Sequence, residues 1–472
     1  MKPHLLLITT DQQRHDALGL NGNPLIQTQN LDAMAARGVN FSRGYTTCPS
    51  CIAARRTILT GQSGATHGLV GFSETAPFDP KFTLPGLLSE AGYQTQLVGK
   101  LHQQPRRKRY GFDHVVLSDG PNVHPNSAWK SQNDYTDWLA EQGVTASSNY
   151  HGVNGNGRLA RPWPMDEYLH QTTWVTTQAI DFMSRKRDPS MPFFLHVSYW
   201  APHPPFIPPR DYYERYVRVM ERWYPTFGRW APPTQEPPPG LDPASATGPF
   251  PLAEMQNAMA GYYGLVNHID DQIQRLMGSF FVYGGQREKE PMWVLFTSDH
   301  GEMLGDHHLF RKGLGYEGSA HVPYFITGYN VESKPARSDA LVCLEDILPT
   351  FCELGGARIP EGVDGRSLAP ILRGETQVPR EELHGEHSGG YANQWLIRGR
   401  HKYIWYAHTN EEQLFDLEAD PHETNDLSGH AELLAPMRAG IARRLRGRTD
   451  YTYDEKKLTP LANRTPEVFW KR

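Results

Sequence analysis

The chain has 472 residues, a formal net charge of −5 and four cysteines, and 38% of its residues are hydrophobic. This apolar content excludes wholesale disorder, the balanced charge excludes the basic footprint of a nucleic-acid-binding protein, and four cysteines cannot form a disulfide scaffold. No apolar run approaches the ~20 residues of a membrane span, and residues 5–8 are too short for the core of a signal peptide. We therefore expect a cytoplasmic protein without a nucleic-acid or membrane partner, unless a leader has been trimmed.

Apolar runs of strand length alternate with helical patterns along most of the chain. The predicted strands are 4–9, 94–98, 193–199 and 292–297. The predicted helices are 29–37, 51–60 with Gly61 at its end, a stretch near 168–187, and 252–277. This alternation predicts an α/β domain over 1–375, built as a large, mainly parallel sheet with helices on both faces.

Three stretches depart from this alternation. Residues 117–165 are polar and rich in Gly and Asn, and residues 201–250 are rich in Pro, so we expect long loops of the kind that shape a binding site. Beyond Gly374 the pattern becomes antiparallel, with strand candidates 395–398, 402–406 and 413–417 before an amphipathic helix over 430–446. We predict a small C-terminal α+β subdomain over 376–450, followed over 451–472 by an arm that could join two subunits of a homo-oligomer.

Polar residues follow each of the four predicted strands of the large sheet. In chain order they are Asp11 and Gln12, then Lys100 and His102, then His203, then Asp299 and His300. In an open α/β sheet, ligands bind outside the carboxyl ends of the strands, so these side chains should meet at one rim. Any one of them could be a turn former or a helix cap, but the four together favour a functional site.

A subset of these residues has the chemistry of a metal site. Asp11, Gln12, Asp299 and His300 offer three oxygen donors and one imidazole. Such a set suits Ca²⁺ or Mg²⁺, and the nitrogen leaves room for Mn²⁺. The alternative is a polar loop without a metal, formed by His300 with Asp306, His307 and His308.

Cys51 stands at the predicted N-terminus of its helix, where free N–H groups and the helix dipole favour an anion. Arg55 follows one turn later on the same face, and a nucleophile beside a guanidinium suits attack on an anionic, tetrahedral ester. Cys48 and Cys51 also form a C-x-x-C, which could be a redox pair or half a zinc site, or Cys51 could simply be buried. Cys343 and Cys352 lie in an apolar segment that we expect to be helical, and we interpret them as core residues on opposite faces.

The segment from Cys51 to Arg55 resembles the C-x-[P/A]-x-R signature of type I sulfatases in the alkaline phosphatase superfamily. Five further segments agree, in the order found in that family: Thr10-Asp11-Gln12-Gln13, Gly99-Lys100-Leu101-His102, Ala201-Pro202-His203-Pro204, Ser298-Asp299-His300-Gly301-Glu302, and Lys312 shortly before Tyr316-Glu317-Gly318. The resemblance covers essentially the whole chain, and the segment after Gly374 matches the family's C-terminal subdomain.

The resemblance implies a covalent mechanism. In this family a formylglycine-generating enzyme oxidises the cysteine, and one hydroxyl of the hydrated aldehyde attacks sulfur while the other later expels sulfate. One divalent cation, most simply Ca²⁺ with Mn²⁺ or Mg²⁺ as alternatives, would be held by Asp11, Gln12, Cys51, Asp299 and His300. The substrate would be a small-molecule or carbohydrate sulfate ester.

The remaining roles are also implied by the resemblance. Arg55, Lys100 and Lys312 would neutralise the sulfate oxygens in a water-poor pocket, where fixed charge is most effective. His102 would orient the gem-diol. The departing alkoxide would take its proton from His203 or from Lys312.

Four residues depart from the usual sulfatase pattern. Ala53 and Ala54 stand where Pro and Ser are more usual, so the aerobic converting enzyme is the less expected maturation route. Gln12 and His300 replace the more frequent Asp and Asn, and this set resembles phosphonate monoester hydrolases of the same superfamily.

Lys100 and His102 match the sulfatases instead, so we predict a sulfatase. The alternatives are a phosphonate or phosphate diester hydrolase and, outside enzymes, an inactive anion- or glycan-binding relative. Specificity is expected in residues 117–165 and 201–250. The cluster over 106–109 could meet a second acidic group of the substrate, although a solvated basic turn is the simpler interpretation.

Overall fold

The computed structural model describes residues 1–119, 133–144, 155–231, 242–284, 289–375, 380–389, 392–448, 453–454 and 457–458. An eight-stranded sheet forms the centre, in the order β4-β3-β5-β1-β6-β7-β2-β8. Its strands are β1 (His4–Asp11), β2 (Val39–Tyr45), β3 (Gln94–Gly99), β4 (His114–Leu117), β5 (Phe193–Pro202), β6 (Met292–Ser298), β7 (Tyr324–Tyr329) and β8 (Ala336–Cys343). Only β7 runs against the others, since it pairs antiparallel with both β6 and β2. The predicted mainly parallel sheet is confirmed.

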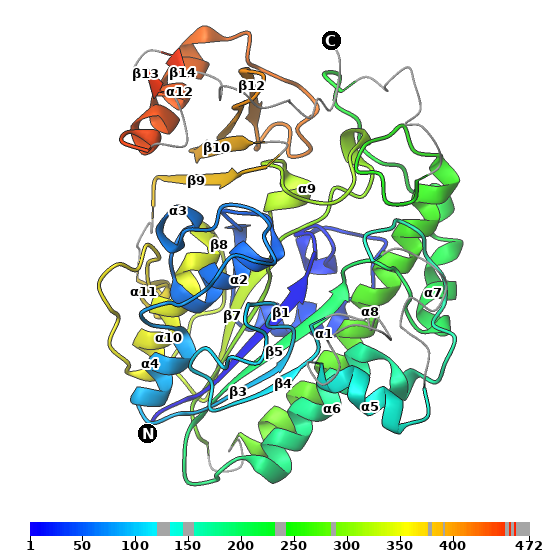
Figure 1. Cartoon of the computed structure of the whole chain (residues 1–472), viewed down its shortest axis with the longest axis vertical. Coiled ribbons are helices and arrows are strands. Elements are labelled where there is room, and N and C mark those ends of the chain that lie inside the picture. The colour runs from blue at the N-terminus through cyan, green and yellow to red at the C-terminus, as the bar shows by residue number, and fades with distance from the viewer. Residues whose placement is uncertain are drawn as a thin grey trace.

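Helices cover both faces of this sheet, as Figure 1 shows. Leu6 and Ile8 of β1 pack into a core with α1 (Gln29–Ala36), α6 (Gln171–Asp181) and α8 (Leu252–Tyr283). Leu5 and Leu7 face the opposite way, into a core with α2 (Cys51–Thr60), α4 (Leu84–Glu90) and α10 (Ile347–Gly355). Every side chain of β1 is buried, and residues 5–8 form a continuous apolar run. Both features are typical of a strand in the middle of a parallel sheet.

The C-terminal part forms a second, antiparallel sheet in the order β12-β11-β10-β9, above the large sheet in Figure 1. Its strands are β9 (Glu382–His387), β10 (Asn393–Arg398), β11 (His401–Tyr406) and β12 (Glu411–Asp416), and α12 (Ala431–Leu445) covers one face. The other face packs Trp395 and Phe415 against Tyr316, which precedes α9 (Glu317–Ala320), so the two sheets share a hydrophobic core. The small sheet with one helix agrees with the prediction, although β9 was not anticipated.

The two stretches expected to be loops contain short helices. α5 (Asp134–Glu141) lies within 117–165, and α7 (Arg210–Val217) lies within 201–250. The prediction of loops throughout is therefore wrong for these two segments: α5 buries Tyr135 and Leu139, and α7 buries Tyr212 and Tyr216. The rest of both stretches lies partly outside the described residues.

Several smaller elements complete the fold. The remaining helices are α3 (Gly64–His67), α9 (Glu317–Ala320) and α11 (Ala369–Leu372). A two-stranded ribbon, β13 (Tyr453–Asp454) with β14 (Lys457–Leu458), is the described part of the predicted arm, whose other residues lie outside the described ranges. Within those ranges, no helix has both the length and the apolar composition needed to cross a membrane.

Candidate active site

The four central strands deliver their polar residues to one rim of the sheet. Asp11 is the last residue of β1, Lys100 follows β3, His203 follows β5, and Asp299 follows β6. The loop after β1 turns at once, because Gln12 adopts a left-handed backbone conformation with φ 73°. The rim predicted from the strand ends is therefore formed.

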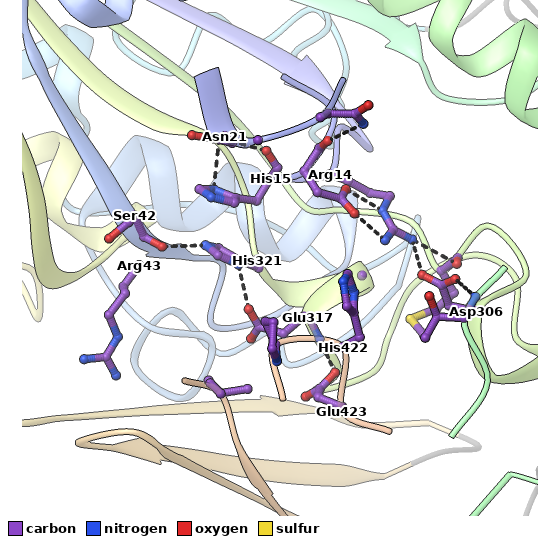
Figure 2. Close-up of a pocket in the computed structure, with 18 of the residues that line it drawn as sticks. Arg14, His15, Asn21, Ser42, Arg43, Asp306, Glu317, His321, His422 and Glu423 are labelled. Atoms are coloured by element: carbon purple, nitrogen blue, oxygen red, sulfur yellow. Dashed lines mark hydrogen bonds and ion pairs between the residues drawn. The ribbon is translucent and has the colours of Figure 1, made fainter. Parts of the chain in front are cut away.

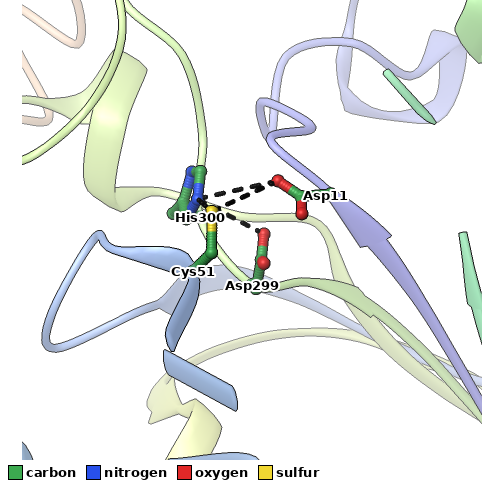
Figure 3. A group of neighbouring side chains, drawn as sticks. All are labelled: Asp11, Cys51, Asp299 and His300. Carbon is green, nitrogen blue, oxygen red and sulfur yellow. Dashed lines mark hydrogen bonds and ion pairs between the residues drawn. The ribbon is translucent and has the colours of Figure 1, made fainter. Parts of the chain in front are cut away.

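Cys51 enters this rim from the opposite side, as the first residue of α2 (Figure 3). Ser50 precedes it in an extended conformation, and the helix ends at Gly61, whose φ of 65° is the left-handed cap that glycine favours. The free N–H groups of the first helical turn therefore lie at the site. Since α2 is buried along its whole length, this terminus is fixed by packing.

Four side chains, Cys51 among them, could hold a metal ion. The ligand atoms of Asp11, Cys51, Asp299 and His300 all lie within 4.8 Å of one another, and all four residues are buried. His300 Nδ1 lies 2.9 Å from the carbonyl oxygen of Gly301, so Nδ1 carries the proton and Nε2 turns its lone pair toward the cluster. His300 Nε2 lies 3.1 Å from Cys51 Sγ. Two carboxylates and an imidazole lone pair in this arrangement fit a divalent cation.

The amide of Gln12 presents its oxygen toward the same cluster. Lys312 Nζ donates to Gln12 Oε1 at 2.5 Å and approaches Cys51 Sγ to 3.4 Å. The side-chain amino group of Gln12 donates instead to the carboxylate of Glu302. Gln12 therefore faces the cluster with a donor atom suitable for a cation.

Three cations lie against the carboxylates and the thiol. Arg55 Nη2 lies 2.9 Å from Asp299 Oδ2 and 3.2 Å from Asp11 Oδ2, and Lys100 Nζ donates to Asp11 Oδ2. Although burial opposes ionisation, Lys100 holds the pKa of Asp11 well below its usual value. Burial likewise opposes ionisation of the Cys51 thiol, yet Lys100 and Lys312 lower its pKa. The site thus stabilises negative charge at the position of Cys51.

Two histidines border this group of charges. His203 Nδ1 donates to the carbonyl oxygen of Pro204 at 2.7 Å, which leaves Nε2 with the lone pair. Burial, reinforced by Lys312, lowers the pKa of His203 well below its usual value. Burial and Lys100 lower the pKa of His102 in the same way. Both imidazoles are neutral in the free protein.

The other interpretations of the cysteines can now be examined. All four cysteines lie within the described residues and are free thiols, so the structure holds Cys48 and Cys51 as separate side chains. Burial raises the pKa of Cys48, in contrast to Cys51. Cys343 ends β8 and Cys352 lies in α10, so the prediction that both belong to one helical segment is wrong, although both are buried core residues as expected.

Comparisons with known proteins agree with this geometry. The family model described as Sulfatase matches residues 3–357, and the model for the C-terminal part of N-sulphoglucosamine sulphohydrolase matches residues 305–449. An arylsulfatase from Clostridium perfringens is 39% identical to this chain and is covered over 97% of both chains. The chain belongs to the sulfatase family. This sulfatase is therefore a sulfuric ester hydrolase, as the resemblance implied.

Solved structures share the fold of this sulfatase. The phosphonate monoester hydrolase of Agrobacterium radiobacter matches with a TM-score of 0.77 and 23% identity over 98% of this chain and 100% of the other. A protein solved in complex with its substrate D-glucosamine-2-N,6-O-disulfate matches with a TM-score of 0.73 and 21% identity over 97% and 100%. The predicted fold class and family are confirmed.

Several residues of the site were not anticipated. Ser198 Oγ accepts from Arg55 Nη1 at 2.8 Å, and the ring of Trp200 lies 3.9 Å from Lys100 Nζ. Both residues belong to β5 and are two positions apart, so their side chains lie on the same face of the strand. This alternation was the only sequence pattern that could have placed them at the site. Glu302 belongs to the segment 298–302 that resembles the sulfatase family. Its position two residues after His300 could have indicated a role at the site.

The sulfatase also has a second cavity of about 700 Å³, shown in Figure 2. The residues described in its lining include none of the ten predicted site residues. Some of its charged groups form ion pairs: Arg14 Nη1 lies 2.8 Å from Asp306 Oδ2, and His321 Nδ1 lies 2.6 Å from Glu317 Oε2. We assign no ligand to this cavity.

Two of the basic residues over 106–109 form ion pairs near the surface. Arg107 Nη1 lies 2.9 Å from Asp134 Oδ1, and Lys108 Nζ lies 2.6 Å from Asp79 Oδ1. Exposed pairs of this kind agree with the interpretation as a solvated basic turn.

Proposed function

We propose that this sulfatase hydrolyses sulfate monoesters after Cys51 has been converted to formylglycine by a dedicated maturation enzyme. The observation that supports this most directly is the position of Cys51, at a helix N-terminus, within 3.1 Å of His300 Nε2 and 3.4 Å of Lys312 Nζ. The Sγ atom stands in for a hydroxyl of the hydrated aldehyde. That group supplies one hydroxyl to attack sulfur and a second to expel sulfate.

The cation of the proposed mechanism is Ca²⁺, with Mn²⁺ and Mg²⁺ as alternatives. Asp11, Gln12, Asp299 and His300 would hold it, together with the group at position 51. When bound, such an ion would lower the pKa of the nucleophilic hydroxyl and polarise a sulfate oxygen. In the metal-free chain, Arg55 bridges the two carboxylates and holds them at the site.

The remaining site residues would stabilise negative charge, orient the nucleophile or donate a proton. Lys312 Nζ lies 3.4 Å from Cys51 Sγ and Lys100 Nζ donates to Asp11, so both would place fixed positive charge beside the reacting group, where it stabilises negative charge that develops in the transition state. His102 lies beside Lys100 and would orient the hydrated aldehyde. We assign the leaving-group proton to His203 rather than Lys312, because Lys312 is already engaged with Gln12 Oε1 at 2.5 Å. His203 is neutral in the free protein, so its Nε2 would first take up a proton, which the negative charge of the bound ester favours.

The names of relatives support our proposal for the substrate class. An N-acetylglucosamine-6-O-sulfatase from Bacteroides thetaiotaomicron is 27% identical over 91% of this chain, so a sulfated carbohydrate is our first choice, with small aryl sulfates as convenient probes. We place its specificity in residues 117–165 and 201–250. The domain boundaries 1–375 and 376–450, the inter-subunit arm over 451–472 and the cytoplasmic location remain predictions.

Mass spectrometry of peptide 44–55 from protein made in the native host tests the mechanism. We expect an aldehyde at Cys51 and an unmodified thiol at Cys48, which serves as an internal control. Cys51→Ala should abolish hydrolysis of 4-nitrophenyl sulfate, whereas Cys48→Ala should retain it. An active protein whose Cys51 is entirely a thiol would contradict the mechanism.

A second candidate function is phosphonate monoester hydrolysis. The pairing of Gln12 with His300 favours it, and a phosphonate monoester hydrolase has the same fold. The ratio of kcat/KM for an aryl sulfate to that for an aryl phosphonate monoester separates the two. We expect the ratio to exceed one, because Lys100 and His102 match the sulfatase pattern.

A further inference from the structure

Glu302 has a fully buried carboxylate to which neither the sequence analysis nor the proposed mechanism assigns a role. Its Oε1 accepts from the backbone N–H groups of Leu304, at 3.1 Å, and of Arg311. Its Oε2 accepts from Gln12 Nε2. Both oxygens therefore act as acceptors.

The amide of Gln12 is held in one orientation from both ends. Lys312 Nζ has only donors, so the Gln12 atom 2.5 Å from it must be the oxygen. The amino group must then face Glu302, which offers only acceptors. The backbone is fixed as well: Gln12 N–H donates to Asp299 Oδ1 at 3.1 Å, and its carbonyl oxygen accepts from Tyr262 Oη at 2.9 Å.

We propose that Glu302 is a positioning residue that sets the direction of the Gln12 amide, so that Oε1 faces Lys312 and the Cys51 cluster. This inference rests on the proposed function, in which Gln12 Oε1 is a donor to the cation. If the amide were reversed, its amino group would face Lys312 and the cation, and both contacts would become repulsive. Glu302 also explains why position 12 carries an amide, since a carboxylate there would face a second buried carboxylate.

Exchanging the two side chains tests the proposal. In Glu302→Gln, the two backbone N–H donors hold the oxygen of residue 302, so its amino group must face Gln12. Gln12 then turns its own amino group toward Lys312, and Mn²⁺ affinity should fall about tenfold to a hundredfold. Gln12→Glu alone should also weaken binding, because two carboxylates meet. In the double variant, the amide of residue 302 donates to a carboxylate at position 12, so the two side chains are again a donor and an acceptor. This variant should regain most of the lost Mn²⁺ affinity.

Mn²⁺ binding is measured by electron paramagnetic resonance of the free ion, which does not depend on conversion of Cys51. Glu345→Gln is the matched control, since Glu345 is another buried carboxyl, which accepts from Thr47 and contacts none of the site residues. We expect it to bind Mn²⁺ as the wild type does. A parallel measurement of kcat/KM at limiting Mn²⁺ should follow the same order.

The outcomes separate this inference from the proposed function. If the wild type binds no divalent cation, the proposed metal site fails. If the wild type binds Mn²⁺ and Glu302→Gln binds it equally well, only the role of Glu302 is refuted. A double variant no better than the single variants, or one that does not fold, also overturns the proposal. If Glu302→Gln neither folds nor binds Mn²⁺ but the double variant does both, the result supports the proposal.

Discussion

A buried group of three charges between the two sheets makes the stability of the protein depend on pH. Lys402 Nζ lies 2.9 Å from Glu423 Oε1 and 2.5 Å from Glu317 Oε1, and Figure 2 shows both carboxylates beside the second cavity. Glu423 shares the ammonium group of Lys402 with Glu317. Burial and the neighbouring charge of Glu317 therefore raise the pKa of Glu423 to about 7, although Lys402 acts in the opposite direction. The folded protein therefore keeps a proton on Glu423 that the unfolded chain, with an ordinary glutamate pKa of 4.5, has already released.

The sign and size of the effect follow from this difference. Between these two pKa values the folded state binds the extra proton, so its contribution to the free energy of unfolding falls as pH rises, by about 1.4 kcal/mol per unit. From pH 5 to pH 8 the loss is about 3 kcal/mol. Glu423→Gln mimics the protonated form at every pH and should not show this loss. Relative to the wild type, the variant should therefore gain about 3 kcal/mol over that range.

Urea unfolding of both proteins at pH 5 and pH 8 measures this difference. Other titrating groups affect both proteins equally, so the difference isolates Glu423. Glu418→Gln, a charge removed from the exposed lining of the same cavity, is the control and should leave the pH dependence of the wild type unchanged. If Glu423→Gln loses as much stability as the wild type between the two pH values, the reasoning is refuted.

Three further changes test other parts of the structure. His203→Gln should slow hydrolysis of alkyl sulfates about a hundredfold or more while sparing 4-nitrophenyl sulfate, whose leaving group needs no proton; equal losses for both would reject His203 as the proton donor. Arg380→Met leaves Asp346 buried without its 2.7 Å partner, and urea unfolding should report a loss of about 3–5 kcal/mol. Gly99→Ala would place its Cβ 1.9 Å from the Ser198 carbonyl oxygen at a φ of 112°, so both unfolding free energy and kcat should fall; wild-type values would contradict this.

The four strands that carry the site were predicted, whereas β2, β4, β7 and β8 were not. β1 and β6 are buried on both faces and therefore form unbroken apolar runs. β8 begins with five residues that are mostly exposed, and β4 is only half-buried, so neither shows the pattern of a central strand. The order of the strands depends on pairings between distant segments and has no local signal.

The residue types of the site were predictable, but their pairing was not. The positions of Asp11 and Asp299 follow from the ends of adjacent strands. That Arg55 bridges these two carboxylates depends on where α2 docks, which is decided by its buried contacts with both sheet and neighbouring helices. Gln12 and Glu302 are far apart in the sequence, so no local pattern predicts the hydrogen bond between them. Which end of the Gln12 amide faces Glu302 depends in addition on the contact with Lys312.

The charge of the site shows why an overall acidic chain can act on an anion. The net charge of −5 is spread over the whole molecule, whereas three cations, Lys100, Arg55 and Lys312, are gathered around Asp11, Asp299 and Cys51. A sulfate monoester brings one negative charge, and the sulfate it releases carries two. Cations fixed beside the reacting group can therefore stabilise the negative charge that develops in the transition state more than the charge of the bound ester, which is the condition for catalysis.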